Sequence, residues 1–442
     1  MNHQGHQTSI GTVSARGCVL VALTGIVLPA LSAQGQDYEW EPLGSGMSNT
    51  VLAATVYNGE LIAGGFFATA GGVTCNHVAR WDGNAWQPLG SGMNDDVHAL
   101  TVYDGALIAG GAFTTAGGVA CNRIARWDGS AWQPLGSGMS GGTEPYVYDL
   151  TVYNGELIAG GDFQIAGDVT CFSIARWDGS AWYPVGSGMN PFLHALTVYD
   201  GDLVAGGRFW NVGGVACNNI ARWDGSAWQP LGSGISGGNT CVLALTVYAG
   251  ELIAGGYDFR SAGGMPCNYI ARWDGNAWHP LGEGMDAPVW ALTVYPAAAG
   301  ELVAGGDFTT AGDVACSHIA RWNGNAWAAV GTGMNGPVYG LTAYNDELIA
   351  GGYFTTAGGA SAKYIAAGVP VPCVGDLNCD GVVDFGDINP FVTYLSDFTG
   401  WQASYPGCNE HNGDTNGDGL YPDFADINPF VQLIASSPLS CP

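Results

Sequence analysis

Two acidic segments near the C-terminus carry the residue types that could bind a metal ion. The first, DLNCDGVVDFGD, begins at Asp376, and the second, DTNGDGLYPDFAD, begins at Asp414. Both place carboxylate and amide oxygens at alternating positions before a glycine that permits a sharp turn. Hard oxygen ligands in this spacing are typical of calcium-binding loops. The sequence therefore predicts two Ca²⁺ sites, with a solvated acidic turn as the alternative.

The predicted ligands follow the spacing of an EF-hand loop, in which positions 1, 3, 5, 7, 9 and 12 face the ion. In the first loop these are Asp376, Asn378, Asp380, the Val382 carbonyl, Asp384 and Asp387. In the second loop they are Asp414, Asn416, Asp418, the Leu420 carbonyl, Asp423 and Asp426. The second loop contains one extra residue before its last two ligands. We therefore expect it to be the looser site.

Each loop runs into the phrase DINPFV and a short apolar stretch suited to a helix, in which Pro390 and Pro429 are tolerable only near the helix start. Two such loop-helix units resemble a dockerin type I domain. The resemblance implies a calcium-dependent module at 376–442, after a linker at 370–375, that binds a cohesin-type scaffold protein or a cell surface. An intramolecular calcium staple against the rest of the chain is an alternative.

Two features of this segment depart from the dockerin pattern. Dockerins that recognise cohesin usually have Ser or Thr early in the helix, where this chain has Phe385-Gly386 and Phe424-Ala425. The spacer between the loops is also long. Calcium binding is therefore expected more firmly than cohesin binding.

Four cysteines concentrate in the same segment, as is common in small extracellular modules. Three pairings are possible. We favour Cys379 with Cys408, and Cys373 with Cys441.

The rest of the chain repeats two phrases, which must form the scaffold for any other site. LTVYNGELIAGG and its variants occur seven times, and ARWDGSAWQPLGSGM and its variants occur six times, with a period of 46 to 50 residues. In the first phrase Asn-Gly separates two β-prone runs, which predicts a hairpin with a tight primed turn. Asp-Gly is expected to do the same in the second phrase. Two hairpins per unit predict the four strands of a propeller blade.

The ends of the repeat region complement each other. The strand of Trp40 is only the last strand of a unit, and the unit ending at Ile365 lacks its last strand. Pairing these two strands completes a seventh blade and leaves no free sheet edge. We therefore predict a mainly β fold, a seven-bladed β-propeller at 38–369 closed by strand exchange, followed by the small α-helical calcium module.

The double glycine, the Trp-initiated strand and the following Pro-Leu turn resemble the kelch-type propeller repeat. They are also similar to repeats in fungal cortical polarity markers and in many bacterial secreted proteins. This resemblance implies an architecture and no particular function.

Positions that recur in every unit are expected to belong to the scaffold. Seven equivalent tryptophans should pack between blades: Trp40, Trp86, Trp132, Trp182, Trp228, Trp278 and Trp327. Six equivalent cysteines are interpreted as buried, unpaired side chains: Cys75, Cys121, Cys171, Cys217, Cys267 and Cys316. The arginines of RWDG are expected to contact neighbouring blades or turns.

Positions that differ between units are better candidates for function. Two places before each LTVY stand Leu52, His98, Tyr148, His194, Leu243, Trp290 and Tyr339. The loops after Gly-Gly add Arg208, Trp210, Tyr257 and Tyr353. Together these side chains predict an aromatic-lined ligand site at the mouth of the channel, suited to a polysaccharide or a surface protein. The alternative is that they simply fill the channel.

No catalytic residue is assigned. The non-repeating acids offer no recognisable pair of the kind that glycosidases need, and there is no nucleophile motif. We therefore favour an exported, non-catalytic binding or adhesion propeller. A carbohydrate-active enzyme, a glycoside hydrolase or polysaccharide lyase within a degrading complex, is the alternative.

Charge and the N-terminus limit the partners further. The chain has 38 Asp and Glu against 11 Lys and Arg, which disfavours nucleic acids and anionic lipids. An apolar run from Cys18 to Leu31 precedes a small-residue cut after Ala33, which is typical of a secretory signal peptide at 1–33. We expect a secreted, extracellular or cell-surface protein with a monomeric propeller and no membrane span.

Overall fold

The computed structural model describes residues 38–295, 300–371, 373–379, 382–405, 408–420, 423–435 and 439–440. The predicted signal peptide and the predicted ligand Asp380 lie outside these residues. Among the described residues, no helix is long and apolar enough to cross a membrane.

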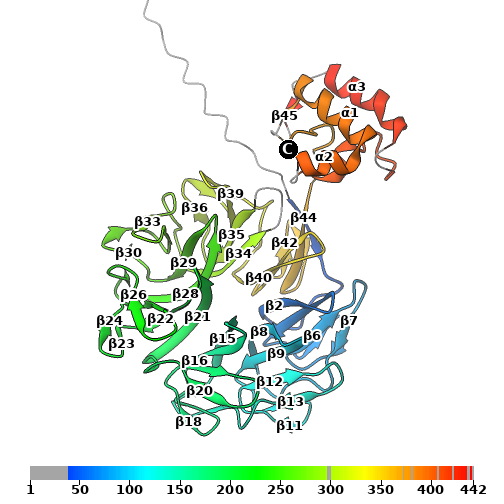
Figure 1. The fold of residues 1–442 in the computed structure, drawn as a ribbon. Coiled ribbons are helices and arrows are strands. Elements are labelled where there is room, and N and C mark those ends of the chain that lie inside the picture. The colour runs from blue at the N-terminus through cyan, green and yellow to red at the C-terminus, as the bar shows by residue number, and fades with distance from the viewer. Residues whose placement is uncertain are drawn as a thin grey trace, which may run out of the picture. The chain divides into compact units, whose positions relative to one another are not determined.

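Seven four-stranded antiparallel sheets make up the described part of the repeat region. Figure 1 shows them arranged around a common centre. In chain order, the first three sheets are β2 (Val51–Tyr57), β3 (Glu60–Gly65), β6 (Val78–Trp81) and β7 (Trp86–Pro88); β8 (Val97–Tyr103), β9 (Ala106–Gly111), β12 (Ile124–Trp127) and β13 (Trp132–Pro134); and β15 (Val147–Tyr153), β16 (Glu156–Gly161), β19 (Ile174–Trp177) and β20 (Trp182–Pro184). The next three are β21 (Pro191–Tyr199), β22 (Asp202–Phe209), β25 (Ile220–Trp223) and β26 (Trp228–Pro230); β28 (Cys241–Tyr248), β29 (Glu251–Tyr257), β32 (Ile270–Trp273) and β33 (Trp278–Pro280); and β34 (Val289–Tyr295), β35 (Glu301–Gly306), β38 (Ile319–Trp322) and β39 (Trp327–Ala329).

The seventh sheet combines both ends of the repeat region. Its strands are β40 (Val338–Tyr344), β41 (Glu347–Gly352), β44 (Ile365–Pro370) and β1 (Tyr38–Pro42). β1 pairs with β44 in antiparallel register, with Trp40 opposite Gly368. One hydrophobic cluster joins Ile365 of this sheet to residues of the first sheet. The first strands of successive sheets pack against each other in order, and β40 packs against β2.

The turn of the first hairpin follows from the sequence, as the first unit shows. In the first sheet, Asn58 and Gly59 connect β2 to β3 with φ angles of 51° and 77°. Two consecutive positive φ angles define the primed turn that suits the twist of a hairpin, and Asn-Gly tolerates them. The predicted turn is therefore present.

The Asp-Gly prediction in the second phrase is wrong in its geometry. Trp81 and Trp86 pair across the strands, so four residues form the loop between them. The Asp82 carboxylate accepts the backbone N–H groups of Asn84 and Ala85 at 3.0 and 2.8 Å. The aspartate braces a longer loop through its side chain, because a short acidic side chain can bond the backbone two and three residues ahead.

A small hairpin, which the repeat pattern did not predict, lies between the second and third strands of each unit. These hairpins are β4 (Thr69–Ala70) with β5 (Val73–Thr74), β10 (Thr115–Ala116) with β11 (Val119–Ala120), β17 (Ile165–Ala166) with β18 (Val169–Thr170), β23 (Asn211–Val212) with β24 (Val215–Ala216), β30 (Ser261–Ala262) with β31 (Met265–Pro266), β36 (Thr310–Ala311) with β37 (Val314–Ala315), and β42 (Thr356–Ala357) with β43 (Ala360–Ser361). β14 (Met139–Ser140) and β27 (Ile235–Ser236) extend two of them.

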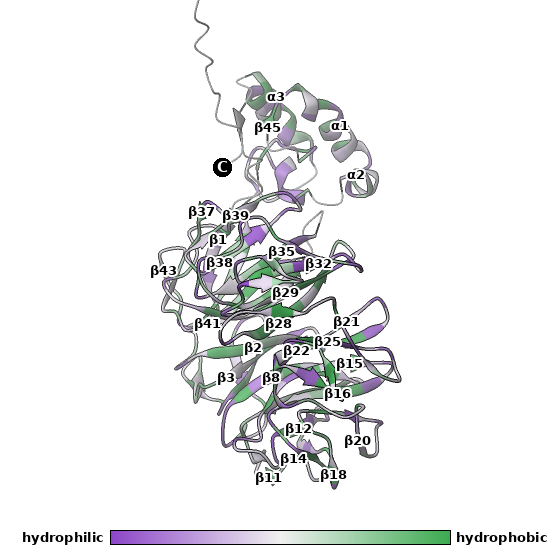
Figure 2. Ribbon diagram, turned by 90° about the vertical axis from the view of Figure 1, so that its left-hand side faces the viewer, coloured by the Kyte–Doolittle hydropathy of each residue, from purple (hydrophilic) through white to green (hydrophobic). Residues whose placement is uncertain are grey.

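The repeated tryptophans are core residues, as predicted. Trp86 is 2% exposed, and its indole Nε1 donates to the Leu43 carbonyl of the preceding unit at 2.9 Å. The other six tryptophans each donate the equivalent hydrogen bond to a backbone carbonyl. Trp40, on β1 of the seventh sheet, donates to the Val330 carbonyl, which follows β39 of the sixth sheet. Figure 2 shows hydrophobic residues concentrated in strands such as β16 and β28. Each tryptophan thus adds buried area and satisfies its polar atom.

Most of the repeated arginines form ion pairs within their own sheet, and Arg321 also makes the predicted contact with a neighbouring sheet, because its guanidinium carbon lies 5.8 Å from the ring centroid of Tyr38 on β1. Arg80 on β6 pairs with Glu60 on β3 at 2.8 Å, and four other repeat arginines pair with the equivalent acid. Arg126 has Ala106 at that position and forms no ion pair among the described residues. The six repeated cysteines are buried and unpaired, as predicted.

The C-terminal segment folds around its own small core. Its elements are β45 (Val382–Val383), the 3₁₀ turn η1 (Phe385–Asp387), α1 (Ile388–Ser396), α2 (Phe398–Ser404), η2 (Glu410–Gly413), η3 (Phe424–Asp426), α3 (Ile427–Ala435) and β46 (Leu439–Ser440). The proline in each DINPFV lies at the third helix position, where its missing N–H costs nothing. α2 lies in the segment predicted to be a spacer, and its Trp401 is fully buried and donates to the Leu377 carbonyl at 3.0 Å.

Disulfides add to this core. Cys379 and Cys408 form the predicted bond. Cys373 is also disulfide-bonded, and its predicted partner, Cys441, lies outside the described residues. The stack of Phe391 on Phe430, with ring centroids 3.9 Å apart, joins α1 to α3.

Candidate functional site at the channel mouth

A β-bulge on the first strand of each sheet positions the residues that differ between units. In the third sheet Val147 pairs with Gly161 and Asp149 with Gly160, so Tyr148 has no partner across the strands. The same shift occurs in all seven sheets. A bulge re-aims the extra side chain while the ladder continues on both sides. Sequence reasoning identified these positions but not the bulge.

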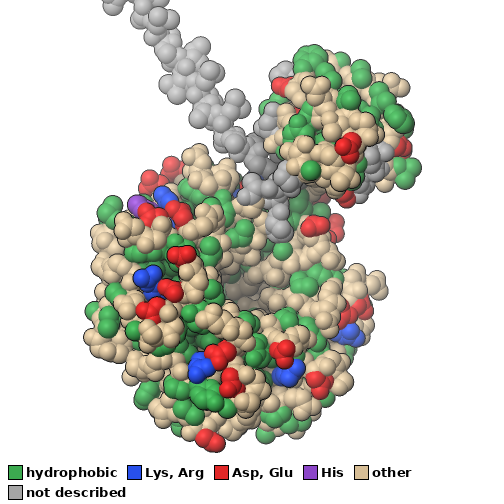
Figure 3. Space-filling model, viewed as in Figure 1, with side chains coloured by type: hydrophobic (Ala, Val, Ile, Leu, Met, Phe, Trp, Pro, Cys, Tyr) green, Lys and Arg blue, Asp and Glu red, His purple; other side chains and the backbone are tan. Residues whose placement is uncertain are grey.

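All seven bulge residues line one cavity of about 230 Å³. They are Leu52, His98, Tyr148, His194, Leu243, Trp290 and Tyr339. Since each comes from a different sheet, the cavity lies at the common centre of the seven sheets, and we call it the channel. Figure 3 shows a hollow at the centre of the sheets, on the face that is turned toward the viewer. The structure therefore brings together the first group of predicted ligand residues.

Aromatic rings form a continuous row along one side of this channel. Tyr148 stacks on His194 with centroids 4.5 Å apart, and His98 lies 5.5 Å from Tyr148. Burial lowers the pKa of His98 and of His194 to about 4. Both imidazoles are therefore neutral at neutral pH, and they contribute ring surface rather than positive charge.

A second, larger cavity of about 480 Å³ opens next to the channel. It shares Tyr148, His194 and Trp290 with the channel and adds two predicted loop residues, Arg208 and Tyr257. We call it the mouth cavity. Its size is in the range of small-ligand sites.

Longer hairpins in the fourth and fifth sheets create this cavity. β21 and β22 extend their pairing so that Phe192 lies opposite Arg208, and in the fifth sheet Cys241 lies opposite Tyr257. All four residues line the mouth cavity. Sequence reasoning missed Phe192 and Cys241, although both lie where their units depart from the repeat.

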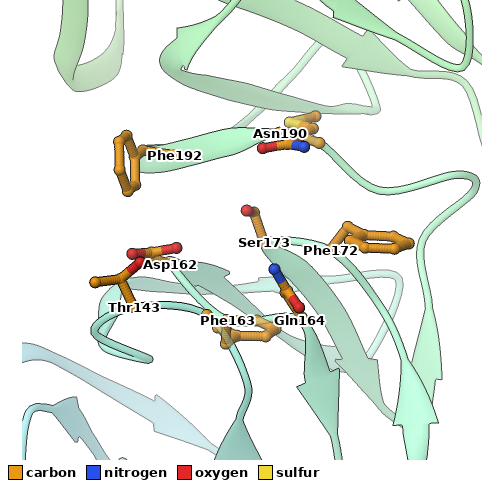
Figure 4. A pocket seen from close by; sticks show the side chains of 10 residues that line it. Thr143, Asp162, Phe163, Gln164, Phe172, Ser173, Asn190 and Phe192 are labelled. Carbon is orange, nitrogen blue, oxygen red and sulfur yellow. The ribbon is translucent and has the colours of Figure 1, made fainter.

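The loop of the third sheet supplies the acidic side of the mouth cavity through Glu144 and Asp162. The Asp162 carboxylate accepts the backbone N–H of Glu144, and its burial raises its pKa. A smaller pocket of about 160 Å³ adjoins the mouth cavity and shares Thr143, Asp162 and Phe192 with it. In Figure 4, Thr143 and Asp162 lie on one side of this pocket and Phe192 on the other.

Trp210 and Tyr353 do not line either cavity. Trp210 is 62% exposed, and Tyr353 contacts Tyr364 with ring centroids 6.0 Å apart. Both follow a double glycine, but neither side chain is among those that line the two cavities. The shared position after Gly-Gly was therefore too coarse a signal for the mouth cavity.

Asp149 is the one acidic residue at its position in the seven inner strands. Its carboxylate accepts the N–H of Leu150 at 2.8 Å and the N–H of Leu196, in the next sheet, at 2.6 Å. Burial raises the pKa of Asp149 to about 7. The side chain bridges two neighbouring inner strands at the channel wall.

The two acidic loops of the C-terminal segment have related hydrogen bonding. Asp387 is fully buried, and its Oδ1 accepts the N–H groups of Leu377 and Asn378 at 2.8 and 3.1 Å. In the second loop Asp426 is fully buried as well, and its Oδ1 accepts from Asn416 N–H at 3.2 Å. The inserted residue therefore leaves the last predicted ligand in an equivalent place.

The start of the second loop curls around Asp414. One carboxylate oxygen accepts from Gly417 and Asp418 at 2.8 and 3.1 Å, and the other accepts from Gly419 at 2.9 Å. The carboxylate and amide oxygens of this loop, and the hydrogen bonds that close it around Asp414, fit a hard cation, because oxygens are the ligands that Ca²⁺ prefers. Among the described residues, no three Asp, Glu, His or Cys side chains gather as a metal cluster.

Comparisons with known proteins support the propeller architecture. Residues 84–250 match the family model of the Rax2 C-terminal beta propeller domain. No curated protein sequence matches the chain significantly. The chain is similar in fold to the extracellular domain of the putative hybrid two component system BT4673 from B. thetaiotaomicron, with a TM-score of 0.50, 11% identity, and coverage of 75% of this chain and 39% of that chain.

The WD40 beta propeller domain of Doa1 is a further similar structure, with a TM-score of 0.48, 15% identity, and coverage of 75% of this chain and 96% of that chain. At such identities the likeness concerns the fold alone. Together with the sheets described above, the match to the Rax2 domain defines a mainly β protein with a propeller fold, an architecture that suits a non-catalytic binding role.

Proposed function

We propose that the protein is an exported binding or adhesion propeller whose ligand occupies the channel mouth. In this proposal the seven sheets are blades, and the pairing of β1 with β44 closes the ring by strand exchange. The observation that carries the proposal is that bulges on the seven first strands direct their variable side chains into one cavity, which continues into the mouth cavity. Rigid aromatic faces beside a few charged groups are suited to binding carbohydrate or protein surfaces.

The test is a glycan array probed with the full chain, followed by calorimetry on the ligands found. Trp290→Ala should weaken binding, whereas Trp210→Ala should leave it unchanged, because Trp210 lies outside the mouth cavity. A polysaccharide-degradation screen runs in parallel. Release of oligosaccharide products would replace the binding proposal by an enzymatic one, and an empty array would overturn carbohydrate binding.

We further propose that the C-terminal segment is a dockerin-like calcium module that tethers the propeller to a cohesin-type partner. The acidic loops that begin at Asp376 and Asp414 would hold calcium, and the bound ion would order both loops. An apolar groove of about 480 Å³ between α1 and α3 supports docking, since Phe385 and Val392 line it and are 72% and 57% exposed. Exposed apolar surface of this kind marks interaction sites.

Calcium titration of the full chain, followed by near-UV circular dichroism of Trp401, tests the first part. Asp387→Asn should lower the calcium affinity, and Asp397→Asn, at the α2 N-cap outside both loops, is the control. A pull-down with a cohesin domain in calcium and in EDTA tests the second part. Calcium binding without capture would favour an intramolecular staple.

A further inference from the structure

The mouth cavity contains a positively charged side chain that no acidic residue neutralises. Five of the repeat arginines, on the third strand of their sheets, pair with acids, and Arg260 pairs with Asp258. Among the described residues, Arg208 forms neither an ion pair nor a side-chain hydrogen bond. In a chain with a net charge of −27, an unpaired, half-buried guanidinium beside a cavity is a candidate for binding an anionic ligand group.

The charged side chains of this cavity come from different sheets. Arg208 lies on β22 and acts electrostatically on the Cys241 thiol of the fifth sheet. The acids, Glu144 and Asp162, belong to the third sheet, and Asp162 is held by the Glu144 backbone N–H. A ligand that fills the cavity therefore meets one guanidinium and two carboxylate acceptors.

Aromatic rings also line this cavity. Tyr148, Phe192, Tyr257 and Trp290 all line the cavity. The Trp290 indole Nε1 is buried without a hydrogen-bond partner in the described part of the chain, so no hydrogen bond fixes the orientation of this ring. It can therefore adjust to a flat ligand ring more freely than the seven core tryptophans, whose Nε1 atoms are all bonded.

We propose that the mouth cavity selects carbohydrates that carry a carboxylate, that is, uronic-acid oligosaccharides. The carboxylate pairs with Arg208, the hydroxyls donate to Glu144 and Asp162, and the sugar faces stack on the aromatic rings. This inference rests on the proposed binding function, and it names the chemical class of the ligand. A charge-assisted, bidentate Arg–carboxylate contact is stronger than a neutral hydrogen bond.

The test is calorimetry on the full chain with short oligosaccharides of galacturonic acid and with the same oligosaccharides after carboxyl reduction. The acidic forms should bind about tenfold more tightly or better. Arg208→Gln should remove that difference. Arg222→Gln, on the same sheet but paired with Asp202, should retain it. The preference should also weaken as salt increases.

Two results distinguish this inference from the proposed function. Equal affinity for acidic and reduced forms, unchanged by Arg208→Gln, would overturn the uronate inference while leaving carbohydrate binding intact. If no oligosaccharide binds but a short peptide with a free C-terminal carboxylate does, and Arg208→Gln abolishes its binding, the ligand is a protein and the uronate inference fails. If no probe binds and the glycan array is empty, the binding function itself fails.

Discussion

The seven sheets contain two rings of equivalent residues that differ sharply in character. In the core ring the residue is always tryptophan, and every indole donates to a carbonyl of the preceding unit, as Trp86 does to Leu43. In the bulge ring the residue is Leu, His, Tyr or Trp, and the one tryptophan there, Trp290, has a buried Nε1 without an acceptor in the described part of the chain.

This difference shows where packing dictates the residue and where it does not. A core position is repeated because the same neighbours surround it in each sheet, and any change leaves a cavity or an unpaired polar group. A bulge residue faces the channel, where the neighbours are other variable side chains. Variation at identical backbone positions within one chain therefore locates the candidate site.

The largest expected effect is on stability, from a change in the core ring. Trp86→Ala should lower the free energy of unfolding by about 3–5 kcal/mol, because it removes a large buried ring and leaves the Leu43 carbonyl without its donor. Trp210→Ala, at a 62% exposed position, should change it by less than about 0.5 kcal/mol. Urea unfolding of both variants measures the difference. Similar losses would mean that the repeated tryptophan is not the structural one.

A change in the bulge ring should affect ligand binding more than stability. Trp290→Ala should weaken binding of the ligand identified on the glycan array by about tenfold or more, as removal of an aromatic anchor does. Its effect on stability should be smaller than that of Trp86→Ala, since Trp290 is only partly buried. Calorimetry and urea unfolding together measure the two effects. A Trp290→Ala protein that binds normally but is destabilised as much as Trp86→Ala would make the bulge ring part of the core.

A smaller effect should appear in the pH dependence of stability. Burial raises the pKa of Asp149 from its usual value near 3.8 to about 7. The folded protein therefore binds more protons at Asp149 than the unfolded chain does between these pH values, so its contribution makes stability fall as pH rises. Asp149→Asn cannot titrate. The wild-type Tm should decrease more between pH 4 and pH 7 than that of the variant, and parallel curves would contradict the raised pKa.

The smallest effect concerns the unit whose repeat arginine lacks an acidic partner. The sheet of Arg126 has Ala106 where the other sheets have an acid, whereas the other five repeat arginines pair with that acid. Ala106→Glu should restore the pair and stabilise the protein by about 0.2–1 kcal/mol, because most of the equivalent pairs are partly open to solvent and such ion pairs contribute little. Ala106→Gln is the neutral control. The gain should disappear in high salt, and a gain that persists would have another cause.

The sequence was a good guide wherever repetition exposes a physical requirement. Asn58-Gly59 requires positive φ angles, and the incomplete first and last units predicted the pairing of Trp40 and Ile365 strands that the sheets contain. The core role of the tryptophans and the Cys379–Cys408 bond were also predictable. In each case the outcome depends on local geometry or on a position seen many times.

Features that depend on single departures or on distant contacts were missed. The small hairpin of Thr69 and Val73 has strands of two residues, too short for an alternating pattern. The bulge at Tyr148 shifts register without a sequence signature. Phe192 enters the mouth cavity because β21 is longer than its equivalents, and the length of a strand depends on its partner as well as on its own residues.

The central claim is that a ligand occupies the channel mouth, and side-chain protection tests it most directly. Hydroxyl-radical footprinting of the full chain would be carried out with and without a saturating array ligand. The account predicts protection of Tyr148, Tyr257 and Trp290, with no change at Trp210 and Tyr353. Protection of Trp210 and Tyr353, with none at the three mouth residues, would contradict it.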